Sequence, residues 1–199
     1  MASEAQIIHA VLHGDVDRYA ELVDQYQQTA RRLAFSMLGN AEDAKDASQE
    51  AFVSAYRSLH RFRGGARFST WLYRIVVNEC QDVYRRRARQ PVAAAQVGEP
   101  DPQTNGVCLF VDVADPAGRP SDQAANRELA HRLSVAIGAL PMRQRTAFVL
   151  HHLHGLPLEE VAQVMHCRLG TVKSHMFRAT EQLRRHLSPW VTQEGASWT

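Results

Sequence analysis

The chain has 199 residues, enough for one medium domain or two small ones, and its 45% hydrophobic content is ordinary for a folded protein. It contains no run of about 18 uncharged apolar residues, so no membrane-spanning helix is expected. The start MASEAQIIHAVLHGD lacks a basic stretch followed by an apolar one, which predicts no secretory signal. The cysteines are three and widely spaced, which argues against a disulfide framework or a CxxC metal pair and favours the cytoplasm: Cys80, Cys108 and Cys167.

Charge is unevenly distributed along the chain. The net charge is +2 over residues 1–90, −4 over 91–126 and +4 over 127–199. Two mildly basic ends flanking an acidic middle favour a polyanionic partner for both ends. We therefore predict a first domain over 1–90, a flexible linker over 91–126, a second domain over 127–188 and a tail over 189–199.

The predicted linker is rich in proline and glycine, which stop helices. Its one apolar run, VCLFV at 107–111, is either a segment resting on a domain or a functional insert. Its five acids are consistent with a flexible tether that they keep soluble.

Helical periodicity dominates the first domain. Tyr19 to Leu33 carries one apolar stripe, Gly39-Asn40 ends that helix, and Phe52 to Leu59 carries a second stripe. After the loop FRGGARF, a third helix is expected over 69–87, with Ser69 or Thr70 as its cap. No long strand pattern occurs, so the fold class is all-α.

The second domain continues this pattern. Two helices are expected over 128–140 and 143–154, separated by Pro141, and Gly155 ends the latter. Pro157 then opens the stretch LEEVAQVMHCRLGTVKSHMFRATEQLRR, which has the small Ala162 where two helices would cross and Cys167 at a corner. This arrangement predicts a helix-turn-helix.

One face of the second helix of this motif is polar. At about 100° per residue, the face opposite Val172 holds Ser174, Arg178, Glu181 and Arg185, with Thr171, Lys173 and Phe177 beside it. Such a helix enters the major groove of DNA, where arginine reads guanine and an apolar ring contacts a thymine methyl group. The alternative is an ordinary helical hairpin with a solvated basic face. The candidate residues for reading duplex DNA are Thr171, Lys173, Ser174, Phe177 and Arg178.

The first domain mixes aromatic rings with arginines in FRGGARFSTWLYRIVVNECQDVYRRRAR. Aromatic rings stack on unpaired bases and arginines follow the phosphate backbone, so the mixture suits single-stranded DNA. Trp71 is better explained as a core residue, whereas Phe62 lies in a loop beside glycines and charges and is less easily explained that way. Arg63 and Arg74 are the arginines that we include among the candidates for the single strand.

Two long motifs together resemble a known family. DAKDASQEAFVSAYRSLHRFRGGARFSTWLYRIVVNECQDVYRRR is similar to region 2, and LPMRQRTAFVLHHLHGLPLEEVAQVMHCRLGTVKSHMFRATEQLRR to region 4, of the extracytoplasmic-function sigma factors of the sigma-70 family, most closely the sigma-E type. STWLYRI and GTVKSHMFRA are the most specific parts. The chain has no long segment between the two regions, as is typical of these small sigma factors.

The resemblance implies a sigma factor rather than an enzyme, with no cofactor or metal. Its implied partners are core RNA polymerase, promoter DNA and an anti-sigma factor. It assigns the largest polymerase subunit to a surface on the DASQEAF helix, at Asp46, Gln49, Glu50 and Phe52. The minus-ten element, as a single strand with one flipped base, is assigned to Ser58, Phe62 and Asn78, to which the mixture of rings and arginines adds Arg63 and Arg74. The minus-thirty-five duplex is assigned to the helix-turn-helix. The connection between the two regions is implied to run near positive channels of the polymerase, which gives the five linker acids a second interpretation, as a stand-in for RNA in such a channel.

Several residues also have a purely structural interpretation, and two other classes of protein are possible alternatives. Asn78 and the acids of DASQEAF are also consistent with solvated helix surface. His151, His154, His166 and Cys167 could suit a metal sensor, although no paired motif completes four ligands. A response regulator would need a phosphoacceptor domain of alternating strands and helices, which the sequence does not predict.

Overall fold

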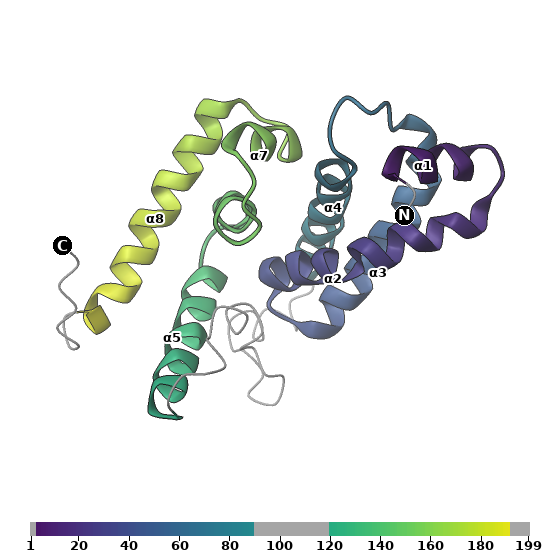
Figure 1. Cartoon of the computed structure of the whole chain (residues 1–199). Helices are drawn as coiled ribbons and strands as arrows, with labels where there is room; N and C mark the ends of the chain where they lie inside the picture. Colours follow the sequence, from purple (N-terminus) through teal and green to yellow (C-terminus); the bar gives the residue numbers. More distant parts are fainter. Residues whose placement is uncertain (1–2, 90–119, 192–199) are drawn as a thin grey trace.

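The computed structural model describes residues 3–89 and 120–191, and all regular structure in these ranges is helical (Figure 1). The predicted all-α fold, with one helical group on each side of a linker, is confirmed. Most of the predicted linker, including its VCLFV run, lies outside the described residues. Within the described part of the chain, no helix is both long and apolar enough to cross a membrane.

The first helical group contains four α-helices and two short 3-10 turns. Gly39, with φ at 71°, ends the second helix, and the side chain of Asn40 caps the third by accepting from the backbone N–H of Asp43 at 3.0 Å. A short first helix was not predicted, although Ser3 and Gln6 form a capping box that signals its start. The helices are α1 (Glu4–Leu12), α2 (Tyr19–Leu38), α3 (Ala41–Ser58) and α4 (Phe68–Arg89), with turns at Val16–Arg18 and Leu59–Arg61.

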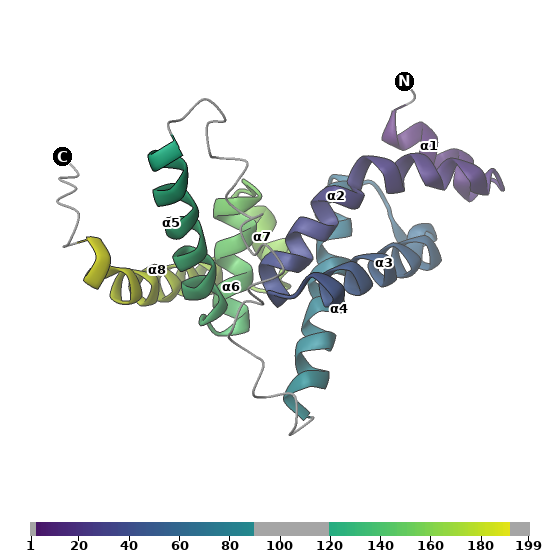
Figure 2. The ribbon, with the colours of Figure 1, turned by 90° about the horizontal axis from the view of Figure 1, so that it is seen from below.

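Helices α2, α3 and α4 pack around a common core (Figure 2). Its largest fully buried side chains include Leu22, Leu33, Met37, Phe68 and Leu72. The predicted cap of α4 at Ser69 or Thr70 is wrong, because the helix already begins at Phe68 and Thr70 lies inside it, buried. The first helical residue, Phe68, is itself buried in this core.

The second helical group starts earlier than predicted. Helix α5 (Pro120–Gly138) begins eight residues before the expected Glu128. The single helix expected over 143–154 is instead α6 (Met142–Phe148) followed by a π-helical turn, Val149–Leu153, in which the N–H of His154 donates to the carbonyl of Val149 at 3.1 Å. Gly155, with φ at 67°, then reverses the chain.

The helix-turn-helix is formed by α7 (Leu158–Val164) and α8 (Leu169–Val191). Its inner faces bury the predicted apolar residues Val161, Val164, Val172, Ala179 and Leu183. The corner between them is tight. Cys167 donates its backbone N–H to the carbonyl of Ala162 at 3.1 Å, and His166 takes a left-handed backbone with φ at 49°.

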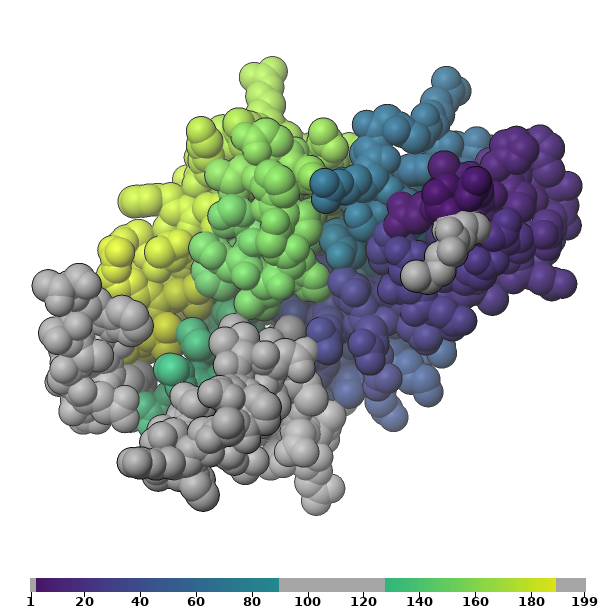
Figure 3. All heavy atoms as spheres, viewed as in Figure 1, coloured from purple at the N-terminus to yellow at the C-terminus, as the bar shows by residue number. Residues whose placement is uncertain are grey.

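The two helical groups touch each other. Helix α7 packs on α4, and α2 contacts α5, α6 and the π-helical turn. In the space-filling view, the green atoms of the second group meet the blue and purple atoms of the first along a continuous seam (Figure 3). The chain therefore folds as two helical groups held against each other.

Candidate nucleic-acid interface

The first turns of α8 present the polar face that the sequence predicts. Thr171, Lys173, Ser174, Phe177 and Arg178 are all exposed, and the Phe177 ring is 71% exposed to solvent. A large apolar ring in that position has no folding role, because it buries almost nothing. The face is available to a partner.

Arg178 is the best-placed cation of this face. Among the described residues it makes no ion pair, whereas Arg184 pairs with Glu181 at 2.6 Å and Arg185 donates to the Glu181 carbonyl at 3.4 Å. The predicted polar face of α8 is therefore divided. At its C-terminal end, Glu181 and Arg185 already take part in bonds within α8, whereas Arg178 does not. The Ser174 hydroxyl donates to the Gly170 carbonyl at 3.0 Å, which leaves its oxygen lone pairs for an outside donor.

Four aromatic rings gather where the loop before α4 meets the helices. Ring centroids lie 5.7 Å apart for Phe62 and Phe68, 5.4 Å for Phe62 and Trp71, and 5.5 Å for Tyr26 and Phe68. Phe68 is buried, while Phe62 and Trp71 are half-buried. Trp71 thus belongs partly to the core, since it packs against Phe62 and Phe68 and is half-buried.

The polar minus-ten candidates come from the end of α3, the loop before α4 and α4 itself. Arg63, Arg74 and Asn78 are exposed, and Asn78 is a solvent-facing amide of α4. Ser58 is half-buried and donates its hydroxyl to the Ser54 carbonyl at 2.6 Å, so it can offer a base only an acceptor. Ser54 in turn donates to Glu79 at 2.9 Å, which fixes α3 against α4 one helical turn from Ser58.

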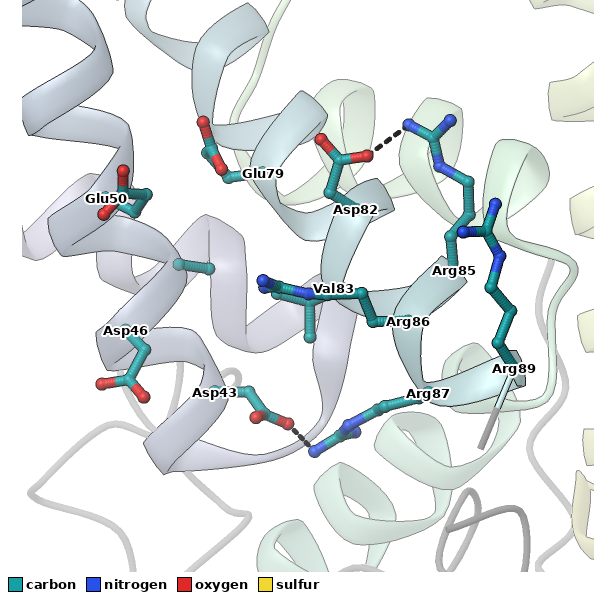
Figure 4. A pocket seen from close by; sticks show the side chains of 11 residues that line it. Asp43, Asp46, Glu50, Glu79, Asp82, Val83, Arg85, Arg86, Arg87 and Arg89 are labelled. Carbon is teal, nitrogen blue, oxygen red and sulfur yellow. Dashed lines mark ion pairs between the residues drawn. The ribbon is translucent and has the colours of Figure 1, made fainter. Parts of the chain in front are cut away.

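The arginine-rich end of α4 borders a groove of about 800 Å³ against α3 (Figure 4). Arg87 is not free to follow a phosphate backbone, because it forms an ion pair with Asp43 and burial lowers its pKa. Arg85 pairs with Asp82 at 2.6 Å. Arg86 and Arg89 make no ion pair in the described ranges, so they carry the positive charge of this edge.

Helix α3 has an exposed acidic face. Asp46, Gln49 and Glu50 are exposed and share this face at helical spacing. Phe52, predicted beside them, is 8% exposed and belongs to the core, while its carbonyl accepts from the Tyr19 hydroxyl at 2.7 Å. Little of Phe52 is therefore open to a partner in the free chain, and its predicted polymerase contact stays a prediction. Val53, which is 42% exposed, also lies on this face, and its spacing of three and four residues from Glu50 and Gln49 could have indicated it.

The histidines do not converge. His151 bonds the carbonyl of Leu156 through Nδ1 at 2.8 Å, whereas His154 packs edge-on against Tyr73 with ring centroids 5.7 Å apart. Burial lowers the pKa of His154 to about 4, and the nearby charge of Arg32 adds to this effect. In residues 3–89 and 120–191, no three metal-ligating side chains are grouped closely enough to hold an ion.

Known families match both helical groups. The sequence matches the family "Sigma-70 region 2" over residues 22–90 and "Sigma-70, region 4" over residues 130–183. SigW of Bacillus subtilis, an ECF RNA polymerase sigma factor, is 34% identical over 180 residues, 90% of this chain and 94% of the relative. The sigma-H factor of Pseudomonas aeruginosa is 35% identical and covers 96% of both chains, and the sigma-E factor of Escherichia coli is 33% identical over 93% of this chain and 94% of its own.

Two solved structures share the fold. CnrH in complex with the cytosolic domain of CnrY has a TM-score of 0.62 at 21% identity and covers 92% of this chain and 96% of its own. RpoE from Bartonella quintana, with the anti-sigma factor NepR, has a TM-score of 0.64 at 23% identity and covers 85% of this chain and 96% of its own. The chain thus matches region 2 and then region 4, and its relatives are about one third identical along nearly its whole length. It therefore belongs to the extracytoplasmic-function sigma factors of the sigma-70 family.

Proposed function

We propose that this sigma factor directs core RNA polymerase to a narrow set of promoters by reading the minus-thirty-five duplex with α8 and the minus-ten single strand with region 2. The observation that carries the proposal is the exposed face of α8. Phe177 and Arg178 stand free on a helix whose opposite side is anchored by buried Val172 and Ala179. A helix that is held firmly by its buried side, and whose exposed side chains have no partner within the described protein, is suited to bind in the major groove of DNA.

The minus-ten strand would be held around the aromatic cluster. The half-buried Phe62 offers an apolar wall for a flipped base, and exposed Asn78 offers a hydrogen-bonding edge. Arg63 and Arg74 would hold the backbone of the same strand, and Ser58 would offer an acceptor. All five lie in the module that we assign to residues 1–90.

Core polymerase would bind the exposed face of α3. Asp46, Gln49 and Glu50 supply charge and hydrogen-bond acceptors, and Val53 supplies apolar area between them. A partner helix with basic and apolar residues would match this face. We further propose a cytoplasmic location and control by an anti-sigma factor in response to stress, because the similar sigma factor RpoE of Bartonella quintana was solved in complex with an anti-sigma factor.

Reconstitution tests the proposal directly. The purified chain is added to core polymerase on genomic templates, and the transcript starts are sequenced. We expect starts that appear only with the chain and that share one upstream element and one minus-ten element. Starts identical to those of core polymerase alone would refute the proposal.

Arg178→Ala should weaken promoter binding by about 5- to 150-fold, because one good bidentate base contact contributes about 1–3 kcal/mol. Arg184→Ala is the matched control, since Arg184 lies on the same helix but pairs with Glu181. Binding of each holoenzyme to duplex promoter is measured, with the upstream element varied base by base. Equal affinity and equal base preference for the two variants would remove Arg178 from the reading face.

Phe62→Ala and Asn78→Ala should relax the preference for one base of the minus-ten element, with little effect on polymerase affinity. Both side chains lie apart from the α3 face that we assign to polymerase. Start-site profiles from a promoter library randomised over the minus-ten element measure this, with Gln28→Ala on exposed α2 as the control. If every position keeps its order of preferred bases, the pocket lies elsewhere.

A further inference from the structure

One side of α8, next to its DNA-reading face, lies against the start of α6. His175, Arg178 and Gln182 share this side at helical spacing, and the Gln182 amide donates to the carbonyl of Ala139, just before α6, at 3.5 Å. Helices α6 and α8 pack against each other. This packing brings the first turn of α6, which carries Arg143, beside the face that holds Arg178.

Arg143 and Arg178 both act on the ring of His175, and we call these two residues the arginine pair. His175 is half-buried, and its Nδ1 is buried without a hydrogen-bond partner among the described residues. Burial lowers the pKa of His175, and the charges of Arg143 and Arg178 lower it further, so the ring is neutral at neutral pH. The charged groups that act on it in the described part of the chain come from α6 and from α8 itself, and none comes from α5 or α7.

The arginine pair has no acidic counterpart. Both side chains are exposed, and neither makes an ion pair with another residue of 3–89 or 120–191. Helix α6 contains no acidic residue, and α8 contains none from Leu169 to Thr180. Two like charges held near each other without a counter-ion are unfavourable in the free chain, and a bound anion removes this repulsion. The arginine pair is therefore suited to an anion from outside the chain.

We propose that Arg143 holds a phosphate of the promoter backbone beside the base that Arg178 reads, so that the minus-thirty-five interface extends from α8 onto α6. This inference rests on the proposed reading role of α8. Phosphates border the bases of the major groove, and contacts to them fix the position of a reading helix without reading sequence. The two arginines would thus divide the work, since Arg178 distinguishes bases and Arg143 anchors the helix.

The salt dependence of promoter binding tests the phosphate contact. Each neutralised phosphate contributes about 0.9 to the slope of log affinity against log salt concentration. Arg143→Ala should therefore lower this slope by about 0.9 for the holoenzyme on duplex promoter, and should weaken binding about 5- to 10-fold at roughly 0.1 M salt. The loss should be equal for every variant of the upstream element, because a backbone contact carries no sequence information.

Arg184→Ala is the matched control for Arg143→Ala. It removes the same charge from the surface of the same region, but Arg184 pairs with Glu181 within α8. Its slope should stay close to that of the wild-type holoenzyme. A slope for Arg143→Ala equal to that of Arg184→Ala overturns the phosphate contact, and so does a changed base preference in Arg143→Ala.

Lysine substitutions distinguish the roles of the two arginines. A phosphate contact needs a positive charge, whereas a bidentate base contact needs the planar fork of the guanidinium group. Arg143→Lys should therefore keep the wild-type salt slope and an affinity within about twofold of wild type. Arg178→Lys should lose preference for the base that it reads, although it keeps its charge. Loss of affinity in Arg143→Lys as large as in Arg143→Ala would contradict a phosphate contact made by charge.

A carboxylate at position 175 provides a second test. His175→Glu supplies the missing counter-charge from within the chain, so it should compete with the DNA phosphate and lower the slope by about 0.9, whereas the neutral His175→Gln should not. Equal slopes for these two variants would show that the arginine pair does not face DNA.

Two outcomes separate this inference from the proposed function. If Arg178→Ala changes base preference but Arg143→Ala keeps the wild-type slope, the contact from α6 is wrong and α8 still reads DNA. If the wild-type holoenzyme prefers no base in the upstream element, the proposed reading role of α8 is wrong.

Discussion

Phe68→Ala lowers the free energy of unfolding by about 3–5 kcal/mol, whereas Phe177→Ala leaves it within about 0.5 kcal/mol. Phe68 is 1% exposed and contacts the rings of Tyr26, Phe62 and Trp71, so its removal leaves a cavity beneath the aromatic cluster. Phe177 is 71% exposed and touches almost nothing in the chain. Urea unfolding of the two variants, followed by circular dichroism, measures the contrast.

The same pair should separate folding from DNA reading. Phe177→Ala is expected to weaken the minus-thirty-five contact while the chain remains as stable as wild type. Phe68→Ala is expected to disturb minus-ten discrimination as well, because Phe62 loses the ring against which it packs. A loss of stability below about 1 kcal/mol for Phe68→Ala would show that the cluster closes over the gap and does not position Phe62.

Arg145→Ala lowers the free energy of unfolding by about 3 kcal/mol, because it leaves the carbonyls of Met37, Gly138 and Leu140 without their donor and each buried unpaired group costs about 1–3 kcal/mol. Arg143→Ala is the control, since Arg143 is exposed on the same helix. Thermal and urea unfolding of the full chain measure both variants.

Arg145→Lys distinguishes the geometry of the guanidinium from its charge. A lysine keeps the positive charge but lacks the planar fork that donates in several directions, so it should recover less than half of the loss. Full recovery by lysine would mean that charge near the helix ends is sufficient. Arg145 also fastens the end of α5 to α6, because it donates to the carbonyls of Gly138 and Leu140.

The sequence by itself determined the features that depend on neighbouring residues. Gly39 and Asn40 mark a helix boundary because a left-handed backbone and a side-chain cap act within one turn. The exposed face of α8 follows from the position of Val172, since residues three and four apart share a helix face. The two sigma regions were likewise identifiable, because each is carried by a continuous motif.

Only the tertiary structure decided which polar and aromatic residues were inside. Phe52 was predicted on the exposed face of α3 but is buried in the core. Arg87 belongs to the arginine-rich segment that was expected to follow a phosphate backbone, but it forms an ion pair with Asp43. Thr70 meets Glu160 across 90 residues, and Arg145 meets Met37 across 108. Helical periodicity places a side chain on a face of its own helix, but the partner of that face depends on how helices distant in the chain pack together.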